Sequence, residues 1–135
     1  MLDSIFMDTN VLVYLYSKNE REKSKKARQC LEHENIWIST QVLNELSNVL
    51  YRKFKIPYLD ILRVMKELEV SFQITVVTPT IIKQALLLGE RYHYSYFDSL
   101  MLASSLEKGC CKIYSEDMQH KQKIESQLTI FNPFY

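Results

Sequence analysis

Short apolar segments alternate with longer amphipathic segments from one end of this chain to the other. The short segments are rich in β-branched and aromatic residues, as strands are, and cover 5–7, 36–38, 73–77, 112–114 and 128–130. Most are separated by stretches whose apolar residues recur every three or four positions, which is the spacing of helices. This alternation predicts an α/β domain with a mainly parallel sheet and right-handed crossovers.

The predicted helices are punctuated by residues that favour helix ends. They cover 11–16, 20–34, 40 to about 54, 59–68, 79–92 and 97–107. Asn19 and Ser39 are the expected N-caps of the second and third, and Gly109 is the expected stop of the last. The helix 97–107 is apolar almost all round, so it should lie centrally and be covered.

Composition indicates a globular protein. The chain has 135 residues, 47% hydrophobic and 24% charged, with only two glycines, so we expect a single domain over 1–135 without linkers. No apolar run reaches the roughly 20 residues of a membrane span, and no signal peptide is evident, so we expect a cytoplasmic protein. The net charge of +1 limits any attraction to nucleic acid to local patches. The three cysteines lack the spacing of a zinc site.

Four acidic residues lie at places where a ligand site would form. Asp8 and Asp117 directly follow predicted strands, and in parallel sheets the ligand crevice lies beyond the carboxyl ends of the strands. Glu45 lies on the third predicted helix and Asp98 at the start of the last one. Each also has a structural explanation. Asp8 could be a helix cap, Asp98 a helix cap or a helix-dipole partner, and Glu45 a solvated helix-edge residue. Asp117 could be a turn residue beside a competing acid, Glu116.

If the fold brings these acids together, their chemistry is constrained. Several carboxylates at close range cannot all stay ionised without a cation between them. Hard oxygen ligands of this kind suit Mg²⁺ or Mn²⁺. A bound cation of that type would favour phosphodiester hydrolysis by an activated water.

Ordered motifs along the chain resemble those of the PIN-domain nucleases, and within them the VapC-type toxins of toxin–antitoxin pairs. The matching segments are Phe6-Met7-Asp8-Thr9-Asn10-Val11-Leu12, Ser39-Thr40-Gln41-Val42-Leu43-Asn44-Glu45-Leu46, Tyr96-Phe97-Asp98-Ser99-Leu100-Met101, Ile113-Tyr114-Ser115-Glu116-Asp117-Met118-Gln119-His120 and Asn132-Pro133-Phe134. They run from one end of the chain to the other. One departure is Lys121, where relatives often carry a small residue.

The resemblance implies a three-layer domain with a five-stranded, mainly parallel sheet flanked by helices. It implies a Mg²⁺- or Mn²⁺-dependent endoribonuclease that is the toxin of a type II pair, forms a homodimer and binds a cognate antitoxin. The residues that match the family's acidic quartet, as both catalytic residues and metal ligands, are Asp8, Glu45, Asp98 and Asp117. Thr9, Asn10 and Ser115 match its accessory polar positions.

Other side chains have a possible role that the sequence leaves open. Arg52, Lys53 and Lys55 form a basic run beyond Glu45 that could hold RNA. Tyr92, Tyr94 and Tyr96 could stack on bases or pack internally. His33, His93 and His120 are unconvincing as general bases, and His120 is the one to test.

Three alternatives compete with a nuclease. A haloacid-dehalogenase-type phosphotransferase would need a second acid at the position of Asn10, and a receiver domain would need a lysine near the end of the last strand. A catalytically silent PIN-like module that binds nucleic acid or protein should have lost members of the quartet, whereas this chain keeps all four residue types.

Overall fold

The computed structural model describes residues 3–33 and 35–135. Its strands are β1 (Ile5–Met7), β2 (Ile36–Ser39), β3 (Gln73–Thr75), β4 (Lys112–Tyr114), β5 (Lys123–Ile124) and β6 (Leu128–Phe131). Its helices are α1 (Thr9–Leu12), the 3₁₀ helix η1 (Val13–Tyr16), α2 (Arg21–Cys30), α3 (Thr40–Arg52), α4 (Tyr58–Ser71), α5 (Pro79–Tyr92) and α6 (Tyr96–Glu107).

The strands form one sheet in the order β3-β2-β1-β4-β6-β5, parallel throughout except for the antiparallel pair β5–β6. The predicted fold class is therefore confirmed, but the predicted number of five strands is wrong. The additional strand, β5, has only two residues and joins β6 through a tight turn at Glu125 and Ser126. Both turn residues have positive φ, at 52° and 57°. Turns of that geometry usually carry Asn-Gly or Asp-Gly, so the sequence offers no hairpin signal here.

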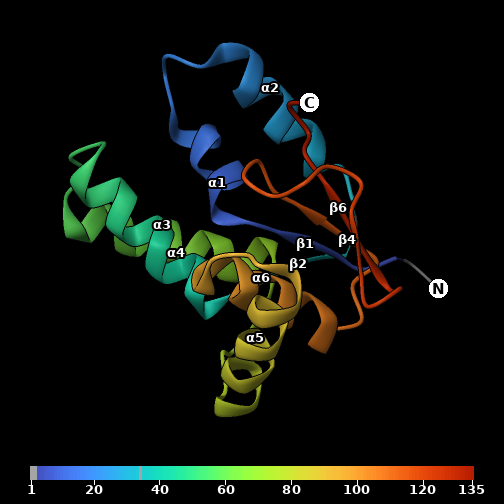
Figure 1. Cartoon of the computed structure of the whole chain (residues 1–135). Helices are drawn as coiled ribbons and strands as arrows, with labels where there is room; N and C mark the ends of the chain where they lie inside the picture. Colours follow the sequence, from blue (N-terminus) through green and yellow to red (C-terminus); the bar gives the residue numbers. More distant parts are fainter. Residues whose placement is uncertain (1–2, 34) are drawn as a thin grey trace.

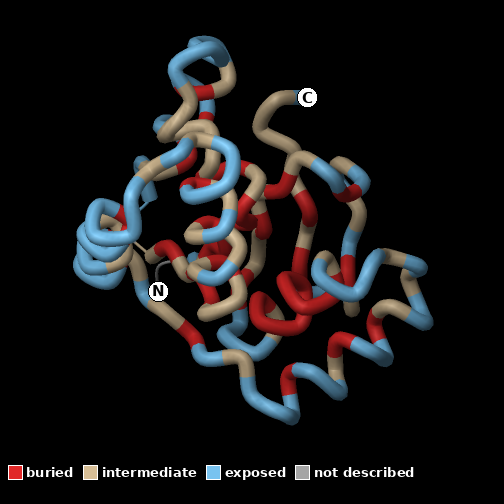
Figure 2. Tube along the Cα trace, turned by 90° about the vertical axis from the view of Figure 1, so that its left-hand side faces the viewer, coloured by how far each residue is buried: buried red, intermediate tan, exposed pale blue. Residues whose placement is uncertain are grey.

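Helices cover both faces of the sheet. Figure 1 shows α2 on one side and α5 with α6 on the other, while α3 and α4 lie beside the end of β1 from which α1 departs. Helix α6 is buried from Ser99 to Ser105, as its all-round apolar sequence predicts. The buried residues concentrate along the central strands and inner helix surfaces, whereas the outer turns are exposed (Figure 2).

The structure confirms two of the predicted helix-end residues and contradicts a third. The Ser39 hydroxyl accepts a hydrogen bond of 3.3 Å from the backbone N–H of Val42, which makes Ser39 the N-cap of α3 as predicted. Gly109 has a φ of +68° directly after α6, as expected of a helix stop. The prediction of Asn19 as an N-cap is wrong, because α2 begins one residue later, with Glu20 in the cap position.

The first two predicted helices differ in extent from those of the structure. The helix expected over 11–16 begins at Thr9 and tightens into 3₁₀ geometry from Val13. The helix expected over 20–34 ends at Cys30, and Glu34 lies outside the described residues. Lys121 has a φ of 69°, in the left-handed region that residues with a side chain seldom adopt.

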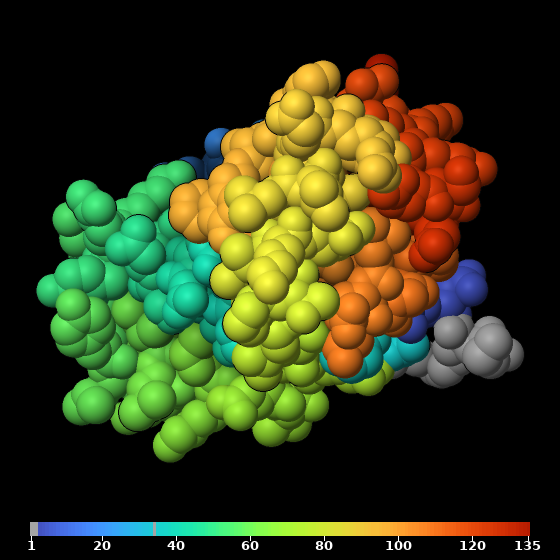
Figure 3. Space-filling model, turned by 60° about the horizontal axis from the view of Figure 1, so that its bottom comes forward, coloured from blue at the N-terminus to red at the C-terminus, as the bar shows by residue number. Residues whose placement is uncertain are grey.

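A large apolar surface remains uncovered on α4 and α5. Its leucines are exposed by 73% at Leu59, 49% at Leu62, 57% at Leu86 and 61% at Leu87. Figure 3 shows this face, with α5 as a yellow ridge beside the green segment that includes α4. Among the described residues, no helix has both the length and the apolar character needed to cross a bilayer.

Candidate active site

Asp8 and Ser115 come together where two neighbouring strands end. The chain adds β2 and β3 on one side of β1 and then β4 on the other, so the topological switch point of the sheet lies between β1 and β4. Met7 pairs with Tyr114 in the ladder, and the N–H of Asp8 donates to the Tyr114 carbonyl at 3.0 Å. The next residue pair is therefore Asp8 and Ser115, and the Ser115 hydroxyl donates to Asp8 Oδ2 at 2.9 Å.

The structural explanation of Asp8 as a helix cap does not hold. Asp8 precedes α1 in the N-cap position, yet its side chain makes no capping hydrogen bond. The residue is only 3% exposed, so its carboxylate is buried without the partner that capping would supply. A buried carboxylate is costly unless it is compensated, which leaves a role in the site as its better explanation.

Asn10 joins the two strand ends into one unit. Its amide Nδ2 donates to the Ser115 hydroxyl at 3.3 Å and to Asp117 Oδ2 at 3.1 Å. Its Oδ1 accepts from the backbone N–H of Glu116 at 3.1 Å. The predicted accessory residues Asn10 and Ser115 thus connect Asp8 to Asp117.

Glu116 and Asp117 have separate surroundings. The Glu116 carboxylate accepts hydrogen bonds of 2.6 Å from both Lys23 Nζ and the Tyr14 hydroxyl. Lys23 thereby ties α2 to the loop after β4, a contact across 93 residues that no sequence pattern announces. Because Glu116 has a cationic partner, Asp117 is the acid of this loop that remains available to a ligand.

Glu45 and Asp98 reach the site from two helices. Glu45 is half-buried on α3, where Gln41 Nε2 donates to its Oε2 at 3.0 Å, so it is not a freely solvated edge residue. Asp98 lies in the first turn of α6, but Ser95 is the cap there, accepting from the Asp98 N–H at 3.2 Å. Asp98 is therefore not the N-cap of α6, although its place in the first turn fits the alternative of a helix-dipole partner.

The four acids influence one another electrostatically. Burial, followed by the charges of Asp98 and Glu45, raises the pKa of Asp8 from 3.8 to about 7, against the lowering effect of the Ser115 hydrogen bond. Burial and the charge of Asp117 raise the pKa of Asp98. Each acid is thus close enough to at least one other for repulsion between them to be felt.

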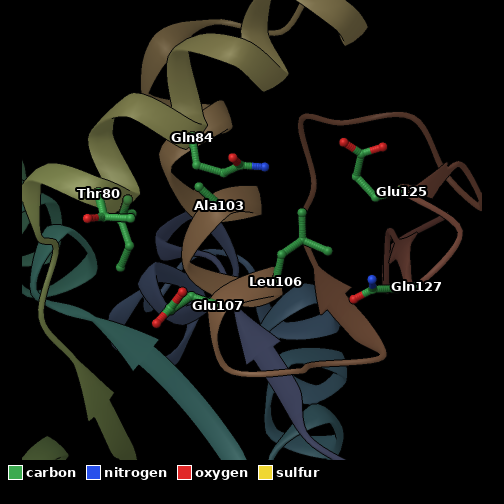
Figure 4. Close-up of a pocket in the computed structure, with 8 residues that line it drawn as sticks. Thr80, Gln84, Ala103, Leu106, Glu107, Glu125 and Gln127 are labelled. Carbon is green, nitrogen blue, oxygen red and sulfur yellow. The ribbon is translucent and has the colours of Figure 1, made fainter.

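An open cavity of about 430 Å³ lies beside Glu45 and Asp117, and neither Asp8 nor Asp98 is among the residues that line it. It is lined by Thr9, Asn10, Val13, Tyr14, Glu45, Asn48, Val49, Lys53, Glu116 and Asp117. Thr9 Oγ1 is buried and has no hydrogen-bond partner in the described part of the chain. A second cavity of about 430 Å³, shown in Figure 4, lies at the far end of α6 beside Glu107 and contains none of the predicted site residues.

The donor set suits a hard divalent cation. Carboxylates with a hydroxyl and an amide oxygen nearby are the ligands that Mg²⁺ and Mn²⁺ prefer. Burial is the largest cause of the raised pKa of Asp8, and the charges of Asp98 and Glu45 add to it. Across residues 3–33 and 35–135, no three His, Cys, Asp or Glu side chains stand close enough together to hold a metal ion directly. A cation held here would therefore need either rotated carboxylates or bridging waters, which Mg²⁺ commonly keeps.

Alternative catalytic groups are occupied or inert. His120 Nδ1 accepts from the Asn132 N–H at 3.0 Å, which gives this histidine a structural role. Burial raises the pKa of the Cys30 thiol to about 11 and that of Cys110 to about 12, so neither is a nucleophile near neutral pH. The hydroxyls of Tyr92 and Tyr94 bond to the segment that contains β5, at Glu125 and Gln119 respectively, so these two rings pack structurally.

The family follows from the sequence as a whole. The family model described as PIN domain matches residues 5–124. This chain belongs to the PIN domain family. The match includes all four acids and both strand ends of the site, so the resemblance seen in the motifs is confirmed. None of the curated proteins gives a significant match.

Solved structures of toxins and toxin–antitoxin complexes share the fold. A toxin–antitoxin complex from Klebsiella pneumoniae has a TM-score of 0.74 at 20% identity, covering 96% of this chain and 98% of that one. VapC20 of Mycobacterium tuberculosis, described as a sarcin–ricin loop cleaving toxin, has a TM-score of 0.68 at 22% identity over 84% of this chain and 90% of that one. VapBC2 of Rickettsia felis, bound to a promoter DNA fragment, has a TM-score of 0.66 at 15% identity over 95% and 98%. At these identities the likeness is one of fold.

Proposed function

We propose that this PIN-domain protein is a Mg²⁺- or Mn²⁺-dependent endoribonuclease that hydrolyses phosphodiester bonds at the four-acid site. The observation that carries the proposal is the buried Asp8 carboxylate, which caps no helix, feels the charges of Asp98 and Glu45, and lies at the switch point of the sheet. A buried acid surrounded by like charges has a reason to exist if a cation neutralises it.

In the proposed mechanism, Asp8, Glu45, Asp98 and Asp117 would hold one or two cations, through rotated carboxylates or bridging waters. The cation would supply a water of lowered pKa and offset charge on the scissile phosphate. Ser115 keeps Asp8 oriented, and Asn10 keeps Asp117 in place beside it. No nucleophilic side chain is required.

Basic residues along α3 and just after it would hold the RNA backbone. Lys53 lines the acidic cavity together with Glu45 and Asp117, so it can meet a phosphate next to the scissile one. Arg52 and Lys55 line a neighbouring cavity of about 530 Å³. We assign Arg52, Lys53 and Lys55 to contacts with RNA phosphates, which do not depend on the base sequence of the RNA.

The biological setting we propose is the toxin of a type II toxin–antitoxin pair, acting in the cytoplasm. Its support is the shared fold with the Klebsiella complex and with VapC20. We expect an antitoxin to inhibit by bringing a basic side chain to the acids, where it would compete with the cation. We also expect a homodimer, because the exposed leucines of α4 and α5 form an apolar face of the kind that a second subunit buries.

Incubation of the purified chain with single-stranded RNA and with DNA of the same sequence tests the activity. RNA cleavage that requires added Mg²⁺ or Mn²⁺ is the expected result. The alternative is a catalytically silent PIN-like module, which would bind RNA or an antitoxin without cutting. Such binding, with intact RNA at every cation concentration, would replace the proposal with that alternative.

A further inference from the structure

A smaller, more apolar cavity lies next to the acidic cavity, the one lined by Glu45 and Asp117. It has a volume of about 380 Å³ and is lined by Gln41, Asn44, Glu45, Asn48 and Phe97. Glu45 and Asn48 also line the acidic cavity, so the two cavities are neighbours. A ligand held at Glu45 would therefore have this cavity next to it.

Helix α3 supplies the polar wall of this cavity. Gln41, Asn44, Glu45 and Asn48 follow each other at helical spacings of three and four residues, so they share one face. Val42, Leu46 and Leu50 anchor the opposite face in the core. Asn44 and Asn48 are exposed, and neither amide has a hydrogen-bond partner within residues 3–33 and 35–135.

Phe97 supplies the apolar wall. It lies in the first turn of α6, next to Asp98, and is 56% exposed. Its ring contacts that of Tyr96 at a centroid distance of 5.4 Å, which leaves much of its surface open. An aromatic ring presented to solvent beside an acidic site is a stacking surface for a planar ligand.

We propose that Phe97 and the amides of Asn44 and Asn48 form a subsite for one unpaired nucleobase next to the scissile phosphate. This inference rests on the proposed function. The base stacks on the Phe97 ring, and the two amides, each both donor and acceptor, bond to its polar edge. The subsite selects single-stranded RNA, because a base within a duplex exposes no free face.

The chemistry of the walls favours a base over the other parts of a nucleotide. No Lys or Arg is among the described residues that line this cavity, so a phosphate would find no cationic side chain there, whereas a neutral base needs none. An aliphatic side chain of a protein partner would leave the amides of Asn44 and Asn48 unused. A nucleobase matches both walls, since it combines a flat π-surface with an edge of donors and acceptors.

Binding measurements on the Asp8→Asn protein, which should not cleave, separate the base from the backbone. Fluorescence anisotropy compares a labelled single-stranded RNA of mixed sequence with an abasic ribose-phosphate chain of the same length. We expect the RNA to bind at least about fivefold more tightly than the abasic chain. Adding Phe97→Leu should abolish this difference without weakening abasic binding, whereas Phe97→Trp should keep it. Tyr135→Leu, at an aromatic residue 80% exposed outside both cavities, is the matched control.

The outcomes distinguish this inference from the proposed function. RNA cleavage by the wild type, combined with equal binding of the two chains and no effect of Phe97→Leu, would overturn the base subsite alone. Failure of both chains to bind, and of the wild type to cleave, would overturn the subsite together with the nuclease. Loss of a copurifying protein partner in Phe97→Leu, with RNA binding unchanged, would reassign this surface to protein recognition and overturn the subsite.

Discussion

Ser115 donates a hydrogen bond of 2.9 Å to Asp8, a residue 107 positions away in the chain, across the ends of β4 and β1. Both residues are buried, so this bond is the main compensation for a carboxylate held away from water. The bond lowers the pKa of Asp8, while burial and two neighbouring acids raise it. The balance leaves Asp8 able to gain or lose a proton near neutral pH.

Stability without divalent cations should depend on Asp8. The carboxyl ionises near 3.8 in the unfolded chain and near 7 in the folded one, so the unfolded state releases its proton first. The free energy of unfolding should therefore fall as the pH rises from about 4 to about 7, by roughly 4 kcal/mol, and stay low above that. Urea unfolding in EDTA measures this dependence.

Asp8→Asn removes the titrating group, so most of the pH dependence of stability should disappear. Asp98 should account for the part that remains. Asp60→Asn, at an exposed residue whose carboxylate lies 3.5 Å from Arg63, is the control and should leave the pH dependence intact. Identical pH dependence in the wild type and Asp8→Asn would contradict the assignment.

Ser115→Ala should move the pH dependence of cleavage. Without the hydroxyl, the pKa of Asp8 rises further, so the acidic limb of the rate profile should shift to higher pH. Ser104→Ala is a matched control, since the Ser104 hydroxyl is buried in α6 without a partner in the described residues. An unchanged profile in Ser115→Ala would mean that ionisation of Asp8 does not limit the reaction.

Asn10→Ala should disconnect Asp117 from Asp8. It removes the three hydrogen bonds that Asn10 makes to Ser115, Glu116 and Asp117, so we expect a loss of about 1–3 kcal/mol in stability and a lower affinity for Mn²⁺. Asn35→Ala removes the hydrogen bonds that Asn35 donates to Ser4 and accepts from Gln73, and should affect stability alone. Isothermal titration with Mn²⁺ compares the two, and equal Mn²⁺ affinity would argue against the bridging role.

The sequence predicted the elements that position the site because their signals are local. Strand-like segments that end at Asp8 and before Asp117, and the Ser39 cap of α3, are each readable within a few residues. The contacts that decide between alternatives are long-range and carry no such signal. Lys23 forms an ion pair with Glu116, and Ser115 donates a hydrogen bond to Asp8, only because the sheet order brings those segments together.

The sequence did not predict strand β5 or the exposure of Phe97, each for an identifiable reason. Strand β5 depends on a turn at Glu125 that lacks the usual glycine and is held by Tyr92 through a hydrogen bond of 2.9 Å. Phe97 opens an apolar helix, so its sequence surroundings predict burial, whereas its position in the first turn leaves it 56% exposed.

The apolar face of α4 and α5 should hold two copies of the chain together. Leu87→Glu places a charge at a leucine that is 61% exposed, so folding should be unaffected while a dimer through this face dissociates. Sedimentation velocity measures the outcome, and Tyr135→Glu is the control at an exposed residue elsewhere. A wild-type monomer at tens of micromolar would contradict the proposed homodimer.

Reversible chelation during RNA cleavage tests the central claim most directly, because it asks whether the four carboxylates act through a cation. The wild type should lose cleavage in excess EDTA and regain it when Mn²⁺ is restored. Asp8→Asn and Asp98→Asn should be inactive at every Mn²⁺ concentration while their circular dichroism stays that of the folded wild type. Cleavage that persists in excess chelator, or in either variant, would contradict a metal-dependent mechanism at this site.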